Sequence, residues 1–261
     1  MKSLQIAATG MAAQQMRVDV ISNNIANMST AAYRPRVAEF SDLVYQQYLT
    51  PGTTTSQTGT LVPAGIQIGT GVRPSTVSME VTQGSLRPTE GELDLAIDGT
   101  GFFEVSLPSG ESAYTRDGKF NRGQDGQIVT MDGYPLADGI VIPEDAQKIT
   151  ISRDGEVVAY FDGVTDGQPI GTISLTRFVN EKGLEAVGDN MFRETQASGT
   201  PSQLVAGSEG AGVIRQGFLE DSGVDVVKEI SDLIEAQRGY ELNSKVITAS
   251  DEMLAATTRL R

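Results

Sequence analysis

Four carboxylates lie close together in the sequence, at Glu90, Glu92, Asp94 and Asp98, and they are the first candidates for catalysis. Two carboxylates that flank a glycosidic bond are the arrangement used by glycoside hydrolases. Charges that alternate beside turns are also typical of the solvated face of a β-strand, because successive side chains point to opposite faces. We favour the solvated strand.

A second group of residues has spacings that resemble a calcium-binding loop. Its members are Asn121, Gly123, Asp125, Gly126 and Asp132. Gly123 offers no side-chain ligand, and Asp132 stands where such a loop needs a long bidentate glutamate. We therefore expect a tight hairpin here and no metal site.

The composition removes most other catalytic chemistry. The chain contains no histidine and no cysteine, so the usual triads and the imidazole and thiolate ligands of zinc are excluded. Gly-x-Ser-x-Gly, P-loop and dinucleotide-binding motifs do not occur either. We expect neither a cofactor nor enzymatic activity.

Length and charge limit the possible partners. The chain has 261 residues, of which 39% are hydrophobic, which is enough for one large domain or two ordinary ones. A net charge of −14 argues against nucleic-acid binding. We expect no membrane insertion, because no apolar run approaches the roughly 18 residues of a membrane-spanning helix. The opening ten residues are too interrupted for a secretory signal, so we expect any export to proceed without a cleaved signal peptide.

Two amphipathic helices are predicted at the ends of the chain, over residues 4–28 and 224–260, because apolar residues recur there at steps of three and four. The first row contains Leu4, Ala7, Met11, Val18, Ile21 and Ile25. The second row contains Val226, Ile230, Leu233, Tyr240, Ile247 and Leu254, with Gln237 among its polar interruptions. An isolated helix cannot bury such a row in water, so each helix needs the other helix or other copies of the chain.

Three asparagines lie at the end of the first predicted helix, at Asn23, Asn24 and Asn27. Asparagine competes with the helix backbone for hydrogen bonds. The residues either mark a fraying helix end, with Asn27 near the C-cap, or form a polar ladder that aligns neighbouring helices. The sequence leaves both interpretations open. Pro35 ends any helix by Tyr33.

The amino-acid composition changes twice in the middle of the chain. Residues 46–71 are either a flexible linker or an extended hairpin with short strands at 61–63 and 66–68. From residue 72 to about 216, repeated Asp-Gly dipeptides separate short β-rich runs, which indicates an antiparallel β domain built from hairpins. The expected fold is α+β: terminal helices within 1–45 and 217–261 form a coiled-coil inner domain and flank the β-rich middle domain 72–216.

Several of these residues together resemble the flagellar rod and hook family of axial proteins. The N-terminal match consists of Gly10-Met11, Gln14-Gln15, the run 19–27 and Tyr33-Arg34. The C-terminal match consists of Gln216-Gly217, Val224-Asp225 and the runs 233–241, 243–245 and 251–254. The middle matches at 69–72, 82–84, 98–103 and 114–118. Two positions depart from the family pattern, where Ala32 replaces a common glycine and Gly223 a usual asparagine.

The resemblance implies a structural subunit that polymerises helically into the distal rod of the bacterial flagellum. It implies export by the flagellar type III apparatus, growth under a rod cap, and a place between the proximal rod and the hook or hook-junction subunits. The rod would run from the periplasm to the outer membrane and turn inside the P and L rings.

Two groups of residues receive roles from this interpretation. The self-assembly interface comprises the two apolar rows with Gln237 and the three asparagines. A segment that stiffens the rod comprises Pro51, Gly52, Leu61, Val62, Pro63, Ile66 and Ile68. The alternatives are a proximal rod or hook subunit of the same family and, more remotely, a periplasmic module that binds or hydrolyses cell wall.

Overall fold

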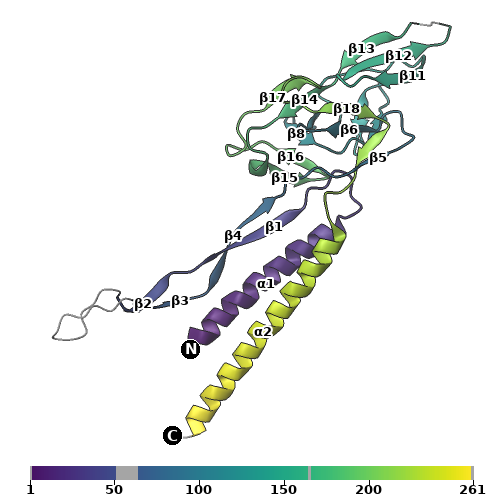
Figure 1. The fold of residues 1–261 in the computed structure, drawn as a ribbon. Coiled ribbons are helices and arrows are strands. Elements are labelled where there is room, and N and C mark those ends of the chain that lie inside the picture. Colours follow the sequence, from purple (N-terminus) through teal and green to yellow (C-terminus); the bar gives the residue numbers. More distant parts are fainter. Residues whose placement is uncertain (1, 51–63, 164–165, 260–261) are drawn as a thin grey trace. The chain divides into compact units, whose positions relative to one another are not determined.

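The computed structural model describes residues 2–50, 64–163 and 166–259. It has a helix near each end and a β-rich middle (Figure 1), as the sequence predicts. The chain forms two compact units. The helical unit is built from residues within 1–26, 36–78 and 225–261, and the β unit from 27–35 and 79–224.

The helical unit contains the two long helices, α1 (Lys2–Ala26) and α2 (Val226–Arg259). Helix α2 begins where Asp225 accepts the backbone N–H groups of Val227 and Lys228 on its side-chain Oδ1, at 3.0 and 3.3 Å. This contact satisfies donors that would otherwise be unpaired at a helix start. Neither helix, over the residues that the structure describes, is long and apolar enough to span a membrane.

The helical unit also contains a β ribbon. Strand β1 (Arg36–Asp42) pairs with β4 (Val72–Met79), and β2 (Tyr45–Leu49) pairs antiparallel with β3 (Ile66–Gly69). The two pairs are joined by a hydrogen bond from the Leu43 N–H to the Gly71 carbonyl, at 2.9 Å.

Gly71 lies where the ribbon meets α1. Its φ is +127°, and a Cβ built on it would lie 2.2 Å from Thr9 Oγ1. The same Oγ1 accepts the Val72 N–H at 3.3 Å. Only glycine suits this conformation and this close approach, so Gly71 lets the ribbon rest on α1.

The β unit consists of short strands and one 3₁₀ turn. In chain order these are β5 (Leu86–Pro88), β6 (Leu95–Asp98), β7 (Phe103–Ser106), β8 (Ser112–Thr115), β9 (Phe120–Arg122), β10 (Ile128–Thr130), β11 (Ala146–Ile151), β12 (Glu156–Phe161), β13 (Gln168–Thr172), β14 (Ser174–Arg177), η1 (Glu181–Gly183), β15 (Glu185–Gly188), β16 (Met191–Arg193), β17 (Ser202–Val205), β18 (Val213–Gln216) and β19 (Phe218–Glu220). The largest sheet has the order β15-β16-β8-β7, and β11-β12-β13 form a second sheet.

Asp-Gly turns build the local hairpins of this unit. Gly126 joins β9 to β10 with φ +77°, and Gly155 joins β11 to β12 with φ +84°. The residues that resemble a calcium loop form the β9–β10 hairpin and its flanks, as expected. Within the described residues, no group of three or more acidic side chains is placed to hold a metal ion.

Pairings between distant segments complete the β unit. Strand β5 pairs with β19 and β6 with β18, so the first and last strands of the unit are joined. Strand β14 pairs with β17. Strand β17 lies within residues 196–212, whose content of serine, glycine and proline is typical of a loop. The core lies beneath these strands and includes the fully buried Leu95, Phe103, Val105 and Leu175.

Candidate assembly interface

Helices α1 and α2 pack antiparallel in one register. Ser3 Oγ lies 3.4 Å from Ser250 Oγ near one end, and Asn24 contacts Glu229 near the other. Between these ends, each helix places a glycine opposite an amide side chain of its partner. A Cβ on Gly10 would lie 3.0 Å from Asn243 Nδ2, and a Cβ on Gly239 would lie 3.1 Å from Gln14 Cδ. These reciprocal contacts fix the register, because a shift would place an amide against a larger side chain.

Asn24 is the most buried polar residue of this seam, with 1% of its surface exposed. Its Nδ2 donates to the Arg36 carbonyl at 2.8 Å and to Glu229 Oε1 at 3.1 Å, and its Oδ1 accepts the Arg36 N–H at 2.9 Å. Asn24 thus connects α1, β1 and α2. Asn23 is exposed, whereas Asn27 follows the helix end and its carbonyl accepts the Thr30 N–H.

The predicted apolar rows flank the seam. In α1, Ala7 and Ile21 are buried, but Leu4, Met11, Val18 and Ile25 are only half-buried. In α2, the half-buried row members are Val226, Leu233 and Ile247, and the exposed ones are Ile230, Gln237, Tyr240 and Leu254. The helices therefore meet along small and polar residues. Sequence reasoning missed Gly10, Ala13, Ala236 and Gly239, although small residues at steps of three and four are a signal for close helix contact.

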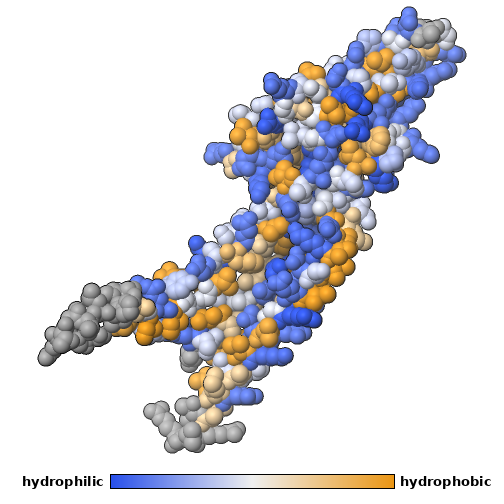
Figure 2. All heavy atoms as spheres, in the orientation of Figure 1, coloured by the Kyte–Doolittle hydropathy of each residue, from blue (hydrophilic) through white to orange (hydrophobic). Residues whose placement is uncertain are grey.

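Helix α2 carries further apolar side chains that α1 does not cover. Val227 is 76% exposed and Leu242 62%, and Ile234, Val246 and Met253 are also exposed. Figure 2 shows apolar atoms along the surface of this helix. Contiguous exposed apolar surface is typical of an interaction site.

The ribbon exposes apolar residues as well. Val44 is 81% exposed, and Tyr45, Tyr48, Ile66 and Ile68 are exposed on β2 and β3. Of the predicted stiffening segment, Pro51, Gly52, Leu61, Val62 and Pro63 lie outside the described residues. The Lys2 ammonium lies 4.6 Å above the Tyr48 ring and donates to Gln46 Oε1 at 2.5 Å. A two-stranded pair is marginally stable alone in water, so this exposed ribbon is suited to packing against another surface.

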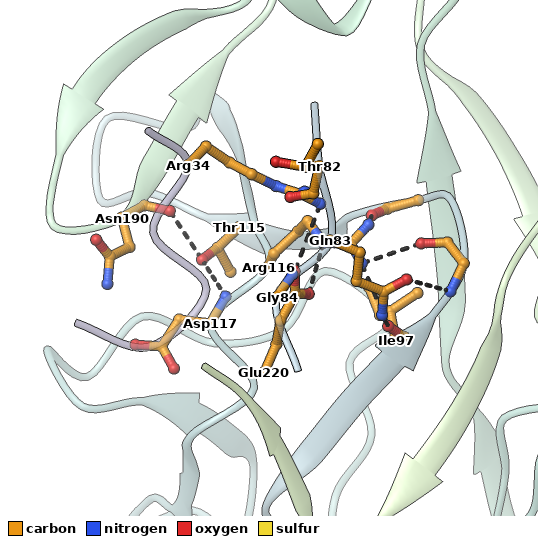
Figure 3. Close-up of polar contacts among 12 residues, drawn as sticks. Arg34, Thr82, Gln83, Gly84, Ile97, Thr115, Arg116, Asp117, Asn190 and Glu220 are labelled. Atoms are coloured by element: carbon orange, nitrogen blue, oxygen red, sulfur yellow. Dashed lines mark hydrogen bonds and ion pairs between the residues drawn. The ribbon is translucent and has the colours of Figure 1, made fainter. Parts of the chain in front are cut away.

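A buried ionic centre lies in the β unit (Figure 3). Glu220 Oε2 accepts the Arg116 Nε–H at 2.9 Å, and its Oε1 lies 3.6 Å from an Arg34 nitrogen and accepts the Gly84 N–H at 3.1 Å. All three charged side chains are almost fully buried. Arg116 also donates to the carbonyls of Ile97, Gly99 and Gly101, at 3.2, 3.0 and 2.8 Å.

In this centre, burial disfavours the charged form of Arg34, whereas pairing with Glu220 favours it. Burial lowers the pKa of Arg34, the nearby positive charge of Arg116 lowers it further, and Glu220 acts in the other direction. Elsewhere in the β unit, burial raises the pKa of Asp117 and of Asp138. Burial, together with Glu104 and Glu194, raises the pKa of Tyr114 to about 12.

The four carboxylates that could have served in catalysis, Glu90, Glu92, Asp94 and Asp98, differ in exposure and in their partners. Glu90 and Glu92 are exposed. Asp98 is ion-paired with Arg215 at 2.6 Å, and the Asp94 N–H donates to the Gly91 carbonyl at 3.3 Å. This is the arrangement of a solvated, turn-flanked segment.

Ala32 occupies a backbone conformation that favours glycine, with φ +54°. Its N–H donates to the Glu220 carbonyl at 2.9 Å, and the Asn190 amide holds the neighbouring Ala31 carbonyl at 3.2 Å. The position that departs from the family's glycine thus keeps the left-handed turn.

We expect Ala32→Gly to change the free energy of unfolding by less than about 1 kcal/mol, because relief of the left-handed strain offsets the added freedom of the unfolded chain. Ala32→Val should cost about 2 kcal/mol or more, because a β-branched residue is poorly suited to this conformation. Urea unfolding monitored by amide exchange in the β unit measures both. Equal stability of the two variants would contradict this account of the turn.

The terminal helices pair with each other but leave their apolar rows only half covered. They are joined to a β unit that contains a buried ionic centre. These features indicate a subunit of a larger assembly. Three family models match the chain: flagella basal body rod protein over residues 4–34, flagellar hook protein FlgE/F/G D1 domain over 96–159, and flagellar basal body rod FlgEFG protein C-terminal over 215–260.

Relatives match along the full length of the chain. It is 50% identical to the flagellar basal-body rod protein FlgG of Caulobacter vibrioides over 261 residues, covering 100% of both chains. It is 46% identical to FlgG of Buchnera aphidicola over 258 residues, covering 99% of both. The chain therefore belongs to the flagellar basal-body rod protein family.

A more distant relative is the flagellar hook-basal body complex protein FlhP of Bacillus subtilis, at 30% identity over 275 residues and 100% of both chains. Among solved structures, the hook protein FlgE2 of Helicobacter pylori aligns over 71% of this chain and 43% of its own, with 16% identity and a TM-score of 0.24, which is too low to inform the fold.

Proposed function

We propose that this chain is a structural subunit of the flagellar distal rod, which polymerises helically into a stiff shaft. The shaft links the proximal rod to the hook and turns inside the P and L rings, from the periplasm to the outer membrane. Full-length similarity to proteins named FlgG supports this assignment. Its assembly partners are the rod cap and the flagellar type III export apparatus, which exports it without a cleaved signal peptide.

The observation that carries the proposal is the incomplete burial of the terminal apolar rows. Leu4, Met11, Val18 and Ile25 on α1 remain half-exposed beside the seam, and α2 exposes further apolar residues on its outer side. Full burial of such a side chain contributes roughly 1.5–3 kcal/mol. Neighbouring copies would supply this burial, and the helix pair would then be the coiled-coil inner domain of the rod.

The ribbon is the stiffening element of the proposal. Ile66 and Ile68 expose their side chains on β3, opposite Leu49 and Gln46 of β2. Two exposed strands that dock on a neighbouring copy would brace the shaft against bending. A hook subunit, the alternative within the family, works as a flexible joint and needs no such brace.

Electron microscopy of the concentrated protein tests the function. The parent should form straight tubes. Replacing the exposed Ile234 and Leu242 by aspartate should leave the helical circular dichroism unchanged and abolish the tubes, because these residues contribute assembly surface and little to the fold of the single chain. The pair Ile66→Asp and Ile68→Asp should give curved or short tubes.

Two results would refute this function. A parent protein that stays monomeric at high concentration is not a rod subunit. Hydrolysis of peptidoglycan by the parent, lost on neutralising Glu90, Glu92 or Asp94, would instead establish the cell-wall module.

A further inference from the structure

Helix α2 is longer than the seam that it forms with α1. Ser250 contacts Ser3, and α1 begins at Lys2, so residues 251–259 of α2 extend beyond the paired region. Nine residues of helix are about 13 Å long. This extension has no counterpart in α1.

The extension combines acidic and apolar side chains. Asp251 and Glu252 are exposed, and neither has an ion pair among the residues that the structure describes. Met253 is 63% exposed and Leu254 44%. The extension is therefore a short amphipathic helix end with two negative charges.

A groove lies at the other end of the helical unit. Its volume is about 330 Å³, and β1, α1 and α2 all contribute to it. The apolar side chains of Val20, Ile21 and Phe40 line it. Its charged lining residues are the cations Arg17, Arg36 and Lys228 and the carboxylates Glu229 and Asp232.

The cations of this groove differ in their partners. Arg17 is ion-paired with Asp232 at 3.2 Å and Glu235 at 3.7 Å, and Glu229 accepts from Asn24. Arg36 and Lys228 have no ion pair within the described part of the chain. The groove thus offers an apolar surface beside two cations, Arg36 and Lys228, that make no ion pair within the described residues.

We propose that the α2 extension of one copy docks in this groove of the next copy. Met253 and Leu254 would pack against Val20, Ile21 and Phe40, while Asp251 and Glu252 would face Arg36 and Lys228. The inference deepens the proposed function, on which it rests, by naming the contact through which copies add.

The contact joins different surfaces at opposite ends of the helical unit. Such a head-to-tail contact generates an open row of copies, except where the rotation between copies closes a ring. The groove of the leading copy stays free to receive the next subunit. Polarity of growth follows from the same asymmetry.

Charge reversal tests the contact in the full-length protein. Lys228→Glu and Glu252→Lys should each raise the critical concentration for polymerisation about tenfold, whereas the double variant should polymerise within about twofold of the parent. An equimolar mixture of the two single variants should also polymerise, because each end then meets an opposite charge. Lys148→Glu and Glu156→Lys, exposed in the β unit, control for net charge and should have no effect. Single reversals without effect, or a double variant that is not restored, would overturn the inference and leave the rod function standing.

Cross-linking tests the contact between the α2 extension and the groove even if the parent protein forms no tubes. The natural chain has no cysteine, so a chain with Lys228→Cys and Glu252→Cys reacts only at these positions. A short bis-maleimide should produce a ladder of multimers from this variant and only traces from the matched pair Lys148→Cys and Glu252→Cys. Equal products from both would overturn the contact. A ladder without tubes would retain the contact and refute the rod function.

Discussion

Replacing Glu220 by glutamine should destabilise the β unit by about 3–5 kcal/mol. The substitution removes the carboxylate that pairs with both Arg34 and Arg116, and it leaves two buried guanidinium groups without this ion-pair partner. Arg116 would retain its three carbonyl acceptors, but these carry only partial charge. Urea unfolding followed by amide exchange of the core strand β7 measures the loss.

The adjacent carboxylate provides a matched control. Asp221 pairs with Arg87 at 3.0 Å, but both side chains are substantially exposed. Asp221→Asn should therefore cost less than about 1 kcal/mol. Comparable losses from the two substitutions would show that burial of the ionic centre is not what makes Glu220 important.

Replacing Asn24 by leucine should destabilise the helical unit by about 2–4 kcal/mol. Leucine has a similar volume, but it removes the partner of the Arg36 N–H and carbonyl groups and one partner of Glu229 at a buried site. Circular dichroism at the helix band reports on this unit, because both α-helices belong to it.

A second substitution separates hydrogen bonding from packing. Asn24→Asp keeps the shape but places a carboxylate against Glu229, so it should also destabilise, and adding Glu229→Gln should restore part of the loss. Leucine at the exposed position Asn23 should have an effect of about 0.5 kcal/mol. An Asn24→Leu variant as stable as the parent would refute the polar connection at this end of the seam.

Local chemistry was readable from the sequence. Steps of three and four among apolar residues predicted both helices to within two residues at each described end, and Asp-Gly dipeptides predicted turns such as those at Gly126 and Gly155. These features depend on interactions within a few residues, and their amino-acid preferences are strong.

Long-range pairing was not readable in the same way. The stretch 196–212 has the composition of a loop, yet β17 is stabilised there by β14. Glu220 is separated from Arg116 by 104 positions, and no local pattern joins them. The residues of closest helix contact, Gly10 and Gly239, were not readable either, because large apolar residues dominate the periodicity of a helix.

The joining of β5 to β19 and of β6 to β18 has a consequence for how such chains evolve. The first and last strands of the β unit are neighbours, so the chain enters and leaves this unit at adjacent positions. Insertions into its peripheral hairpins can enlarge or reshape the β unit without changing the distance between these two positions. The surface of the β unit can thus change during evolution while the sequence constraints on the terminal helices stay the same.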